Sequence, residues 1–291
     1  MASETLQQTD SHHLESGERE GRIPILISGL PGKMATLVAE AIHSDERFVL
    51  LSSGLSSERH SLEDVFIGHE RVFLSPHFPL HLRICHPGQT IIAVDFTTPP
   101  SANINAQLFA ESNAPFVMGT TGGNRDEMVE VVRRSQINAV IAPNMAISVV
   151  EVQDQLNRLT ETSPNCFHGW HMRIRESHQA AKRDVSGTAR AFQAQLEQLG
   201  AVMDGEIASI RDPEVQRQLG IQNLDGHAYH WITLTGPDGE TREFTTAIEG
   251  RAPYVEGTLA AIRFLARQMR NGSQGEVFTM SDVVRDLRRT I

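Results

Sequence analysis

The chain is poor in cysteine, has no excess of basic side chains and contains no long apolar run. Its 291 residues include 2 cysteines, Cys85 and Cys166, which are far apart, so they can build neither a disulfide framework nor a zinc knuckle. Lys and Arg number 26 against 36 Asp and Glu, and the net charge of -10 argues against nucleic-acid binding. No window approaches the roughly 20 apolar residues of a membrane span, so no membrane partner is expected.

The remaining composition is that of a soluble globular protein. Apolar residues make up 40% of the chain and its 22 glycines follow no period, which excludes collagen, coiled coil and wholesale disorder. The first 22 residues are polar and acidic, whereas a secretory signal needs an apolar stretch and a transit peptide avoids acids. We therefore expect residues 1–22 to be a disordered leader and the protein to be cytoplasmic.

Strands and helices alternate from residue 23 onward. The apolar run 23–28 predicts a buried strand, and an apolar stripe over 34–42 predicts an amphipathic helix after a glycine turn. Further strands are expected at 48–51, 89–95, 115–118 and 139–142, with helices at 102–112 and 125–135. This order is typical of an α/β protein with a Rossmann-like, doubly wound parallel sheet.

The pattern changes after Asn144. A helix is expected at 148–160, followed by strands at 167–176, 207–211, 227–235 and 243–248, with 236–239 as a hairpin turn. These features predict a second α+β domain with a mixed or antiparallel sheet, and the helices at 255–269 and 280–290 are expected to pack back on the first domain. We assign residues 23–147 plus 252–291 to a dinucleotide-binding domain and 148–251 to a substrate-binding domain.

The glycine turn that starts at Gly29 lies between the first buried strand and its helix. Backbone amides of such a turn, together with the helix N-terminus, can hold a pyrophosphate. The spacing departs from G-x-G-x-x-G, so an ordinary strand–helix turn stays an alternative. The loops after the other strands lie at the edge where open α/β sheets bind ligands. The residues expected to contact the cofactor are Gly29, Leu30, Pro31, Gly32, Lys33, Met34, Ser52, Ser53, Phe96, Thr97, Gly119, Thr120, Thr121, Ala142, Pro143, Asn144 and Met145.

The second strand bears on the choice of cofactor. Ser52 and Ser53 stand where NAD enzymes place an acid for the ribose hydroxyls, so no carboxylate would repel a 2′-phosphate. Lys33 and Arg59 add positive charge nearby. These residues favour NADPH over NADH.

The densest polar cluster is the segment 176–188. His178 can donate a proton near neutral pH, and Lys182 would face the same side if the stretch forms one helical turn. Ser186 is a natural N-cap, which leaves the amides of Gly187 and Thr188 free for a carboxylate. A surface histidine and a capped helix would explain the same residues without function. No metal-binding pattern is present, and no metal cofactor is expected.

Together these segments resemble the dihydrodipicolinate reductase family, also called 4-hydroxy-tetrahydrodipicolinate reductases, and most closely its plant-type branch. The resemblance spans most of residues 23–291. Its most specific motif is Glu-Ser-His-Gln-x-x-Lys-x-Asp-x-Ser-Gly-Thr-Ala at 176–189. The other motifs that carry it are Gly29–Met34, Val94–Thr97, Gly119–Gly122 and Ala142–Met145.

The resemblance implies a reaction and roles for residues. NADPH or NADH would deliver hydride to C4 of the unsaturated ring that forms when the hydroxylated substrate loses water, and a proton would add at C3 to give tetrahydrodipicolinate for lysine and diaminopimelate biosynthesis. His178 falls on the family's proton donor and Lys182 on its charged partner. Gly187 and Thr188 fall on the amide pair that receives a carboxylate of the small dicarboxylate substrate. Arg251 is a further candidate cation.

Gln179 is a departure, because many bacterial members carry a second histidine there. It can hydrogen-bond a carboxylate but cannot become charged, and we expect it, with Thr121, to contact substrate. Family members are dimers or tetramers joined through the second-domain sheet, so a homodimer or homotetramer formed through 148–251 is expected. Two other functions stay open: another NAD(P)-dependent amino-acid or semialdehyde dehydrogenase, and a catalytically silent nucleotide-binding module.

Overall fold

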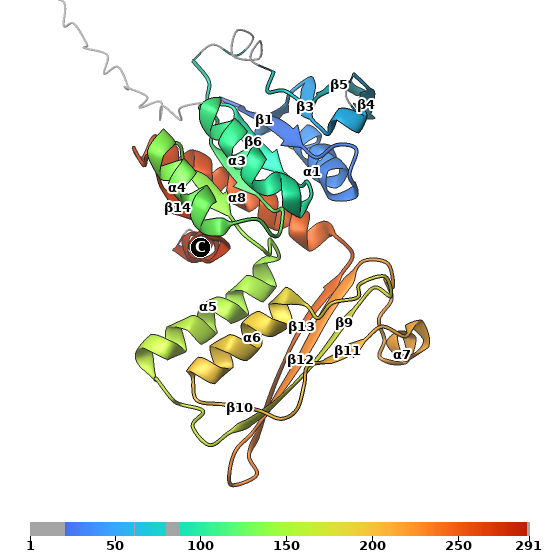
Figure 1. Ribbon diagram of the computed structural model, residues 1–291, viewed down its shortest axis with the longest axis vertical. Coiled ribbons are helices and arrows are strands. Elements are labelled where there is room, and N and C mark those ends of the chain that lie inside the picture. The colour runs from blue at the N-terminus through green and yellow to red at the C-terminus, as the bar shows by residue number, and fades with distance from the viewer. Residues whose placement is uncertain (1–20, 61, 80–85, 87, 290–291) are drawn as a thin grey trace, which may run out of the picture.

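The structure, a computed structural model, describes residues 21–60, 62–79, 86 and 88–289, so Cys85 and most of the predicted leader lie outside the described residues. The described chain builds a parallel sheet at the top of Figure 1 and a mixed sheet at the bottom. This confirms the predicted fold class. None of the described helices combines the length and apolar composition that crossing a membrane requires.

The first sheet is parallel except at one edge. Its strand order is β14-β8-β7-β6-β1-β3-β5-β4, with β2 beside β1, and only the β4–β5 pair among these described strands is antiparallel. The strands are β1 (Ile23–Ser28), β2 (Phe48–Leu50), β3 (Ser53–Leu55), β4 (Asp64–Ile67), β5 (Glu70–Ser75), β6 (Ile92–Asp95), β7 (Phe116–Met118), β8 (Ala139–Ile141) and β14 (Val277–Phe278).

Helices cover both faces of this sheet, which is why its central strands are apolar throughout. Ile25 and Ile27 of β1 pack with α1 and α8, whereas Leu26 between them packs with α3 and α4 on the opposite face. This alternation follows from the two-residue period of a strand. The helices are α1 (Lys33–His43), α3 (Ala102–Glu111), α4 (Arg125–Ser135) and α8 (Ala252–Arg270).

The second sheet has the order β10-β9-β12-β13, with β11 also paired to β9. β12 runs antiparallel to both β9 and β13, whereas β10 and β11 are parallel to β9. Apolar side chains of β9 and β12 pack in one core with Phe192 and Leu196 of α6 and with Val149 and Leu156 of α5. These elements are α5 (Ile147–Thr162), β9 (His171–His178), α6 (Gly187–Gln198), β10 (Val202–Met203), β11 (Ala208–Ile210), α7 (Pro213–Gln218), β12 (His227–Thr235) and β13 (Thr241–Glu249).

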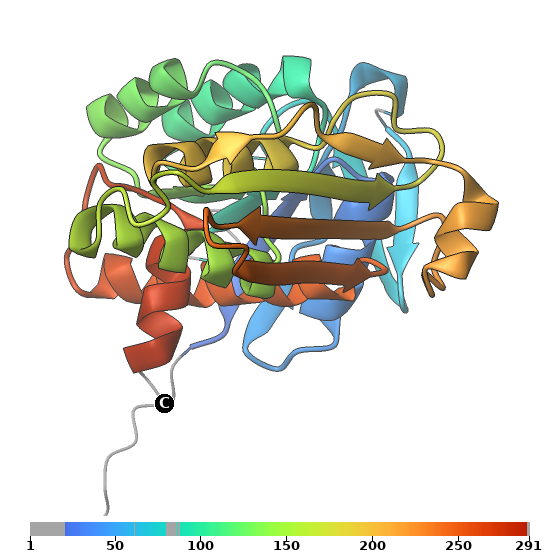
Figure 2. The same ribbon diagram turned by 90° about the horizontal axis from the view of Figure 1, so that it is seen from below.

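The C-terminal segment returns to the first sheet. β14 pairs with β8, α8 packs against α1, and α9 (Met280–Arg289) packs against α5. Close packing at the junction depends on Gly257 of α8, where a Cβ would lie 1.7 Å from the carbonyl oxygen of Met145. The two sheets therefore meet beside the carboxyl ends of the first sheet's strands (Figures 1 and 2).

Several local expectations need correction. Strand β3 at Ser53–Leu55 was not predicted, and the strand expected at 167–176 is displaced to His171–His178 because β12 pairs with it up to His178. The β4–β5 hairpin and α7 were not predicted. The hairpin turn at 236–239 is confirmed, because the amide of Gly239 donates to the carbonyl of Gly236 at 3.0 Å.

Candidate active site

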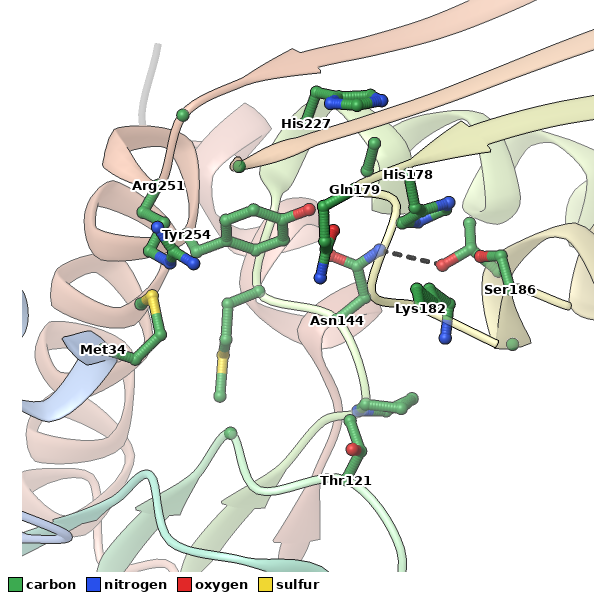
Figure 3. Close-up of a pocket in the computed structure, with 18 of the residues that line it drawn as sticks. Met34, Thr121, Asn144, His178, Gln179, Lys182, Ser186, His227, Arg251 and Tyr254 are labelled. Atoms are coloured by element: carbon green, nitrogen blue, oxygen red, sulfur yellow. Dashed lines mark hydrogen bonds between the residues drawn. The ribbon is translucent and has the colours of Figure 1, made fainter. Parts of the chain in front are cut away.

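A cavity of about 380 Å³ lies between the two sheets (Figure 3). Strand ends of the first sheet, the end of β9, the N-terminus of α6 and the start of α8 all contribute to its wall. The predicted site residues that line it are Met34, Phe96, Gly119, Thr121, Pro143, Asn144, Met145, His178, Gln179, Lys182, Gly187, Thr188 and Arg251. Residues that are far apart in the sequence therefore meet in one chamber.

His178 is the last residue of β9, and the strand geometry determines its partner. Residues two apart in a strand face the same side, so Glu176 and His178 lie together on the face toward α6. Nδ1 of His178 donates to Oε2 of Glu176 at 2.5 Å. Because Nδ1 is held in this way, Nε2 is the nitrogen left for a ligand.

Glu176 is fully buried and is held by donors from two directions. The guanidinium of Arg211 forms a fork, with Nη2 at 2.6 Å from Oε1 and Nη1 at 3.0 Å from Oε2. The hydroxyl of Ser209 donates to Oε1 at 2.5 Å. Burial raises the pKa of Glu176, but the hydrogen bonds from His178, Arg211 and Ser209 outweigh it and lower the pKa to about 2. The carboxyl is therefore an anion throughout the physiological range.

Lys182 lies on a turn after β9 instead of a helix. Pairing with β12 keeps the chain extended to His178, after which the amide of Lys182 donates to the carbonyl of Gln179 at 3.0 Å. The expectation that one helical turn brings His178 and Lys182 to the same side is therefore wrong, although both residues line the cavity. Nζ of Lys182 donates to Asp184 at 3.2 Å.

The N-terminus of α6 faces the same cavity. Ser186 occupies the N-cap position as predicted, but its side chain makes no capping hydrogen bond; its hydroxyl instead lies 3.1 Å from Nε2 of His230. The side chain of Asn144 reaches over from the first sheet and donates to the hydroxyl of Thr188 at 3.2 Å. The first amides of the helix are thus left without a side-chain cap, and they point into a site that can receive an anion.

His230 does not line the cavity but lies buried behind His178, and the sequence did not reveal this contact. It stands opposite Glu176 in the β9–β12 pairing, and its ring lies 5.4 Å from that of His178. Burial, together with the neighbouring His178, lowers the pKa of His230 to about 4. His230 is therefore a neutral ring near pH 7 and lies 2.9 Å from the hydroxyl of Thr246.

Cations occupy two sides of the cavity. Figure 3 shows Arg251, which precedes α8, and Lys182, on the turn after β9, across the chamber from each other. Tyr254 lies beside Arg251, and burial raises the pKa of its hydroxyl. A ligand with a negative charge at each end would be matched by this arrangement.

A second hollow, of about 630 Å³, lies along the glycine turn and the ends of β3 and β6. Gly29 has a φ of +107° and a Cβ there would lie 2.3 Å from the carbonyl oxygen of Phe96, so only glycine fits. Among the described residues, no side chain caps α1 and no acid lies in its first turn. A helix start with no side-chain cap and no acid in its first turn fits a dinucleotide pyrophosphate.

The predicted cofactor residues divide between these two hollows. Gly29, Leu30, Pro31, Gly32 and Thr97 line the second hollow. Lys33, Ser52, Ser53, Thr120 and Ala142 line neither.

The positions of Ser52 and Ser53 require a correction. Ser53 is buried within β3, and the groove beyond that strand is instead lined by Ser56, Ser57 and Glu58. The chain therefore carries a carboxylate at the end of this strand. The absence of a carboxylate, one of the two observations that favoured NADPH, therefore does not hold in the structure.

A parallel sheet with an open glycine turn, next to a polar chamber, defines a Rossmann-type, dinucleotide-dependent oxidoreductase. Residues 23–145 match the family model of the dihydrodipicolinate reductase N-terminus and residues 152–284 that of its C-terminus. The chain belongs to the dihydrodipicolinate reductase family.

Individual relatives agree with this assignment. The chain is 37% identical to "Probable 4-hydroxy-tetrahydrodipicolinate reductase 2, chloroplastic" of Oryza sativa subsp. japonica, over 90% of this chain and 83% of that protein. It is 36% identical to "4-hydroxy-tetrahydrodipicolinate reductase 1, chloroplastic" of Arabidopsis thaliana, over 91% and 78%. A dipicolinate-bound dihydrodipicolinate reductase from Paenisporosarcina sp. TG-14 shares the fold, with a TM-score of 0.65, 19% identity and coverage of 89% and 98%. The two plant relatives confirm the plant branch predicted from the motifs.

Proposed function

We propose that the protein reduces 4-hydroxy-tetrahydrodipicolinate, through dihydrodipicolinate, to tetrahydrodipicolinate with NAD(P)H, in lysine and diaminopimelate biosynthesis. The observation that carries the proposal is the single cavity in which His178, Lys182 and the uncapped N-terminus of α6 come together beside the nucleotide groove. The names of the relatives support the same reaction.

The dicarboxylate substrate would be held at both ends. The amides of Gly187 and Thr188 would bind one carboxylate, with Lys182 beside them, and Arg251 would attract the other across the chamber. Gln179 and Thr121 line the same chamber and would complete the contacts as hydrogen-bonding groups. This pairing explains why an acidic protein gathers cations here.

The proton would come from His178. When bound, the nicotinamide cofactor supplies the hydride that adds at C4 of the ring. Nε2 of His178 would hold the proton that adds at C3, while Nδ1 stays bonded to Glu176. The neutral His230 packs against His178 and adds no competing positive charge near pH 7.

NADPH was expected over NADH, but Glu58 lies in the groove where the adenosine ribose would sit. A carboxylate there can bind ribose hydroxyls and repels a 2′-phosphate. We therefore propose that the protein accepts NADH, and that Glu58 limits its use of NADPH.

A coupled assay tests the reaction. A synthase would generate the hydroxylated precursor in place, and the absorbance of NADPH or NADH would be followed after this protein is added. Oxidation that depends on the precursor supports the proposal. No oxidation of either cofactor, with a verified precursor and a folded protein that binds cofactor, would favour another dehydrogenase activity or a silent module.

We also propose that residues 23–147 plus 252–291 bind the nucleotide, and that residues 148–251 bind substrate and join subunits in a homodimer or homotetramer. The outer face of the second sheet supports an interface, because Tyr229 and Trp231 lie there 5.4 Å apart with Arg175 stacked on Trp231. Sedimentation of the wild-type protein is expected to show a dimer or tetramer, and Trp231→Glu is expected to dissociate it. A monomeric wild type would contradict the proposed assembly. The cytoplasmic location stays a prediction for cell fractionation.

A further inference from the structure

One buried ion pair contacts both His178 and the turn that carries Lys182. Its carboxylate, on Glu176, accepts from Nδ1 of His178 at 2.5 Å. Its guanidinium, on Arg211, donates to that carboxylate and also to the turn that carries Lys182. There, Nε of Arg211 is 2.8 Å from the carbonyl oxygen of Lys182, and Nη2 is 3.2 Å from that of Asp184.

The pairing of β11 with β9 explains how Arg211 reaches this position. The two strands are parallel, with Ser209 opposite Glu176 and Ile210 opposite Ser177. Arg211 follows two residues after Ser209, so its side chain starts on the same face of the sheet as the Glu176 carboxylate. Because β11 ends at Ile210, the guanidinium extends past the strand end and contacts the turn after β9.

The charges of the pair suit a fixed support. A bidentate fork constrains the plane of the carboxylate as well as its position. The carboxylate stays ionised at physiological pH, so it accepts from Nδ1 of His178 in every catalytic state. The ring is then fixed in one orientation, with Nε2 as the nitrogen that exchanges a proton.

We propose that Glu176 and Arg211 are positioning residues that hold the proton donor and the substrate cation in one rigid unit. Glu176 orients the ring of His178 through the hydrogen bond to Nδ1. Arg211 orients Glu176 and fixes the backbone on which Lys182 is mounted. The inference deepens the proposed function and rests on it, because it assumes that His178 gives a proton and Lys182 meets substrate.

Two conservative variants test the proposal. Glu176→Gln keeps the size of the side chain but removes its charge, and Arg211→Lys keeps the charge but loses the fork. Matched controls are Glu214→Gln and Arg217→Lys, because these residues form an exposed pair on α7 with Nη1 and Oε2 3.2 Å apart. Circular dichroism establishes that each variant is folded. If Arg211→Lys does not fold, Glu176→Gln decides alone.

The kinetic prediction separates positioning from a merely structural role. Both variants are expected to lower kcat about 10²-fold, near the lower end of what loss of a general acid costs, with cofactor Kd within about twofold. The controls should match wild type. A kcat within about threefold of wild type in Glu176→Gln would overturn the proposal.

A second readout does not depend on activity. In protein labelled with ¹⁵N-histidine, NMR at alkaline pH should show the neutral ring of His178 protonated at Nδ1 in wild type. Glu176→Gln should populate both tautomers. Nε2 protonation in wild type, or an unchanged tautomer in the variant, would overturn the proposal. If wild type shows the expected tautomer but oxidises no cofactor with the precursor, the proposed function fails and the positioning of the ring stands.

Discussion

At the residue scale, two buried groups near the end of β9 differ in charge because their hydrogen-bond partners differ. Glu176 and His230 stand opposite each other and are both buried, and burial disfavours the charged form of each. Charged and polar donors overcome that penalty for Glu176, whereas the nitrogens of His230 are paired with hydroxyl groups and its ring stays neutral. Of these two histidines, His178 is therefore the one that is hydrogen-bonded to an anion.

His178→Gln tests this assignment directly. We expect turnover to fall by about 10²–10⁴-fold, the range for a lost general acid, with little change in cofactor affinity. Steady-state kinetics and cofactor titration would measure both. The control is His171→Gln, at the exposed other end of the same strand, where the ring pairs with Asp204 at 2.7 Å. Equal turnover in the two variants would remove His178 from the mechanism.

Glu58→Gln is predicted to change the preference for cofactor. Removing a carboxylate from the groove at the end of β3 lowers the repulsion of a 2′-phosphate, so the ratio of kcat/KM for NADPH to that for NADH should rise about 10-fold. The coupled assay gives kcat/KM for each cofactor, and so this ratio in wild type and in the variant. Glu70→Gln, at an exposed position of β5 outside the groove, serves as the control. An unchanged ratio would mean that Glu58 does not face the ribose.

At the element scale, β12 contributes His230 to the core between the second sheet and α6. Its pKa of about 4 lies below the 6.5 of an exposed histidine, because burial opposes protonation. The contribution of this group to the free energy of unfolding is therefore fully present above about pH 6.5. It is lost as the pH falls towards 4, which lowers the free energy of unfolding by roughly 3 kcal/mol. Urea unfolding at pH 7 and pH 4.5 would measure the loss. His230→Gln should weaken the pH dependence; an equal dependence would assign the loss to other groups.

Elements that follow a local period could be predicted from the sequence, and contacts between distant strands could not. The apolar run and stripe around Gly29 predicted β1 and α1, and the range of β12 was predicted in full. The support of His178 was missed because Arg211 lies 35 residues after Glu176 and reaches it only through the β9–β11 register. Likewise Ser186 carries a strong N-cap signal, but the buried His230 takes its hydroxyl.

At the scale of the whole molecule, the proposed reaction requires the two sheets to keep their relative positions on either side of the cavity. The chain crosses from the first sheet to the second after Met145 and returns at Arg251, so both crossings border the chamber. Helix α8 then packs along the first sheet, and α9 packs against α5, with Asp154 fully buried and its Oδ1 2.8 Å from Nε of Arg285. These contacts set how the groove along the glycine turn and the cavity lie relative to each other in this structure.

Gly257→Ala is predicted to disturb this junction. The added Cβ would overlap the carbonyl oxygen of Met145, and since a backbone atom cannot yield as a flexible side chain can, α8 must shift. We expect a loss of about 1–3 kcal/mol in the free energy of unfolding, the usual cost of overpacking, measured by urea titration. Turnover should fall further than the folded fraction accounts for, because Arg251 and Tyr254 move with the helix while His178 does not.

Glu256→Ala, the exposed neighbour on α8, should leave both quantities near wild type. A Gly257→Ala variant as stable and active as wild type would show that the two sheets tolerate a change in their separation.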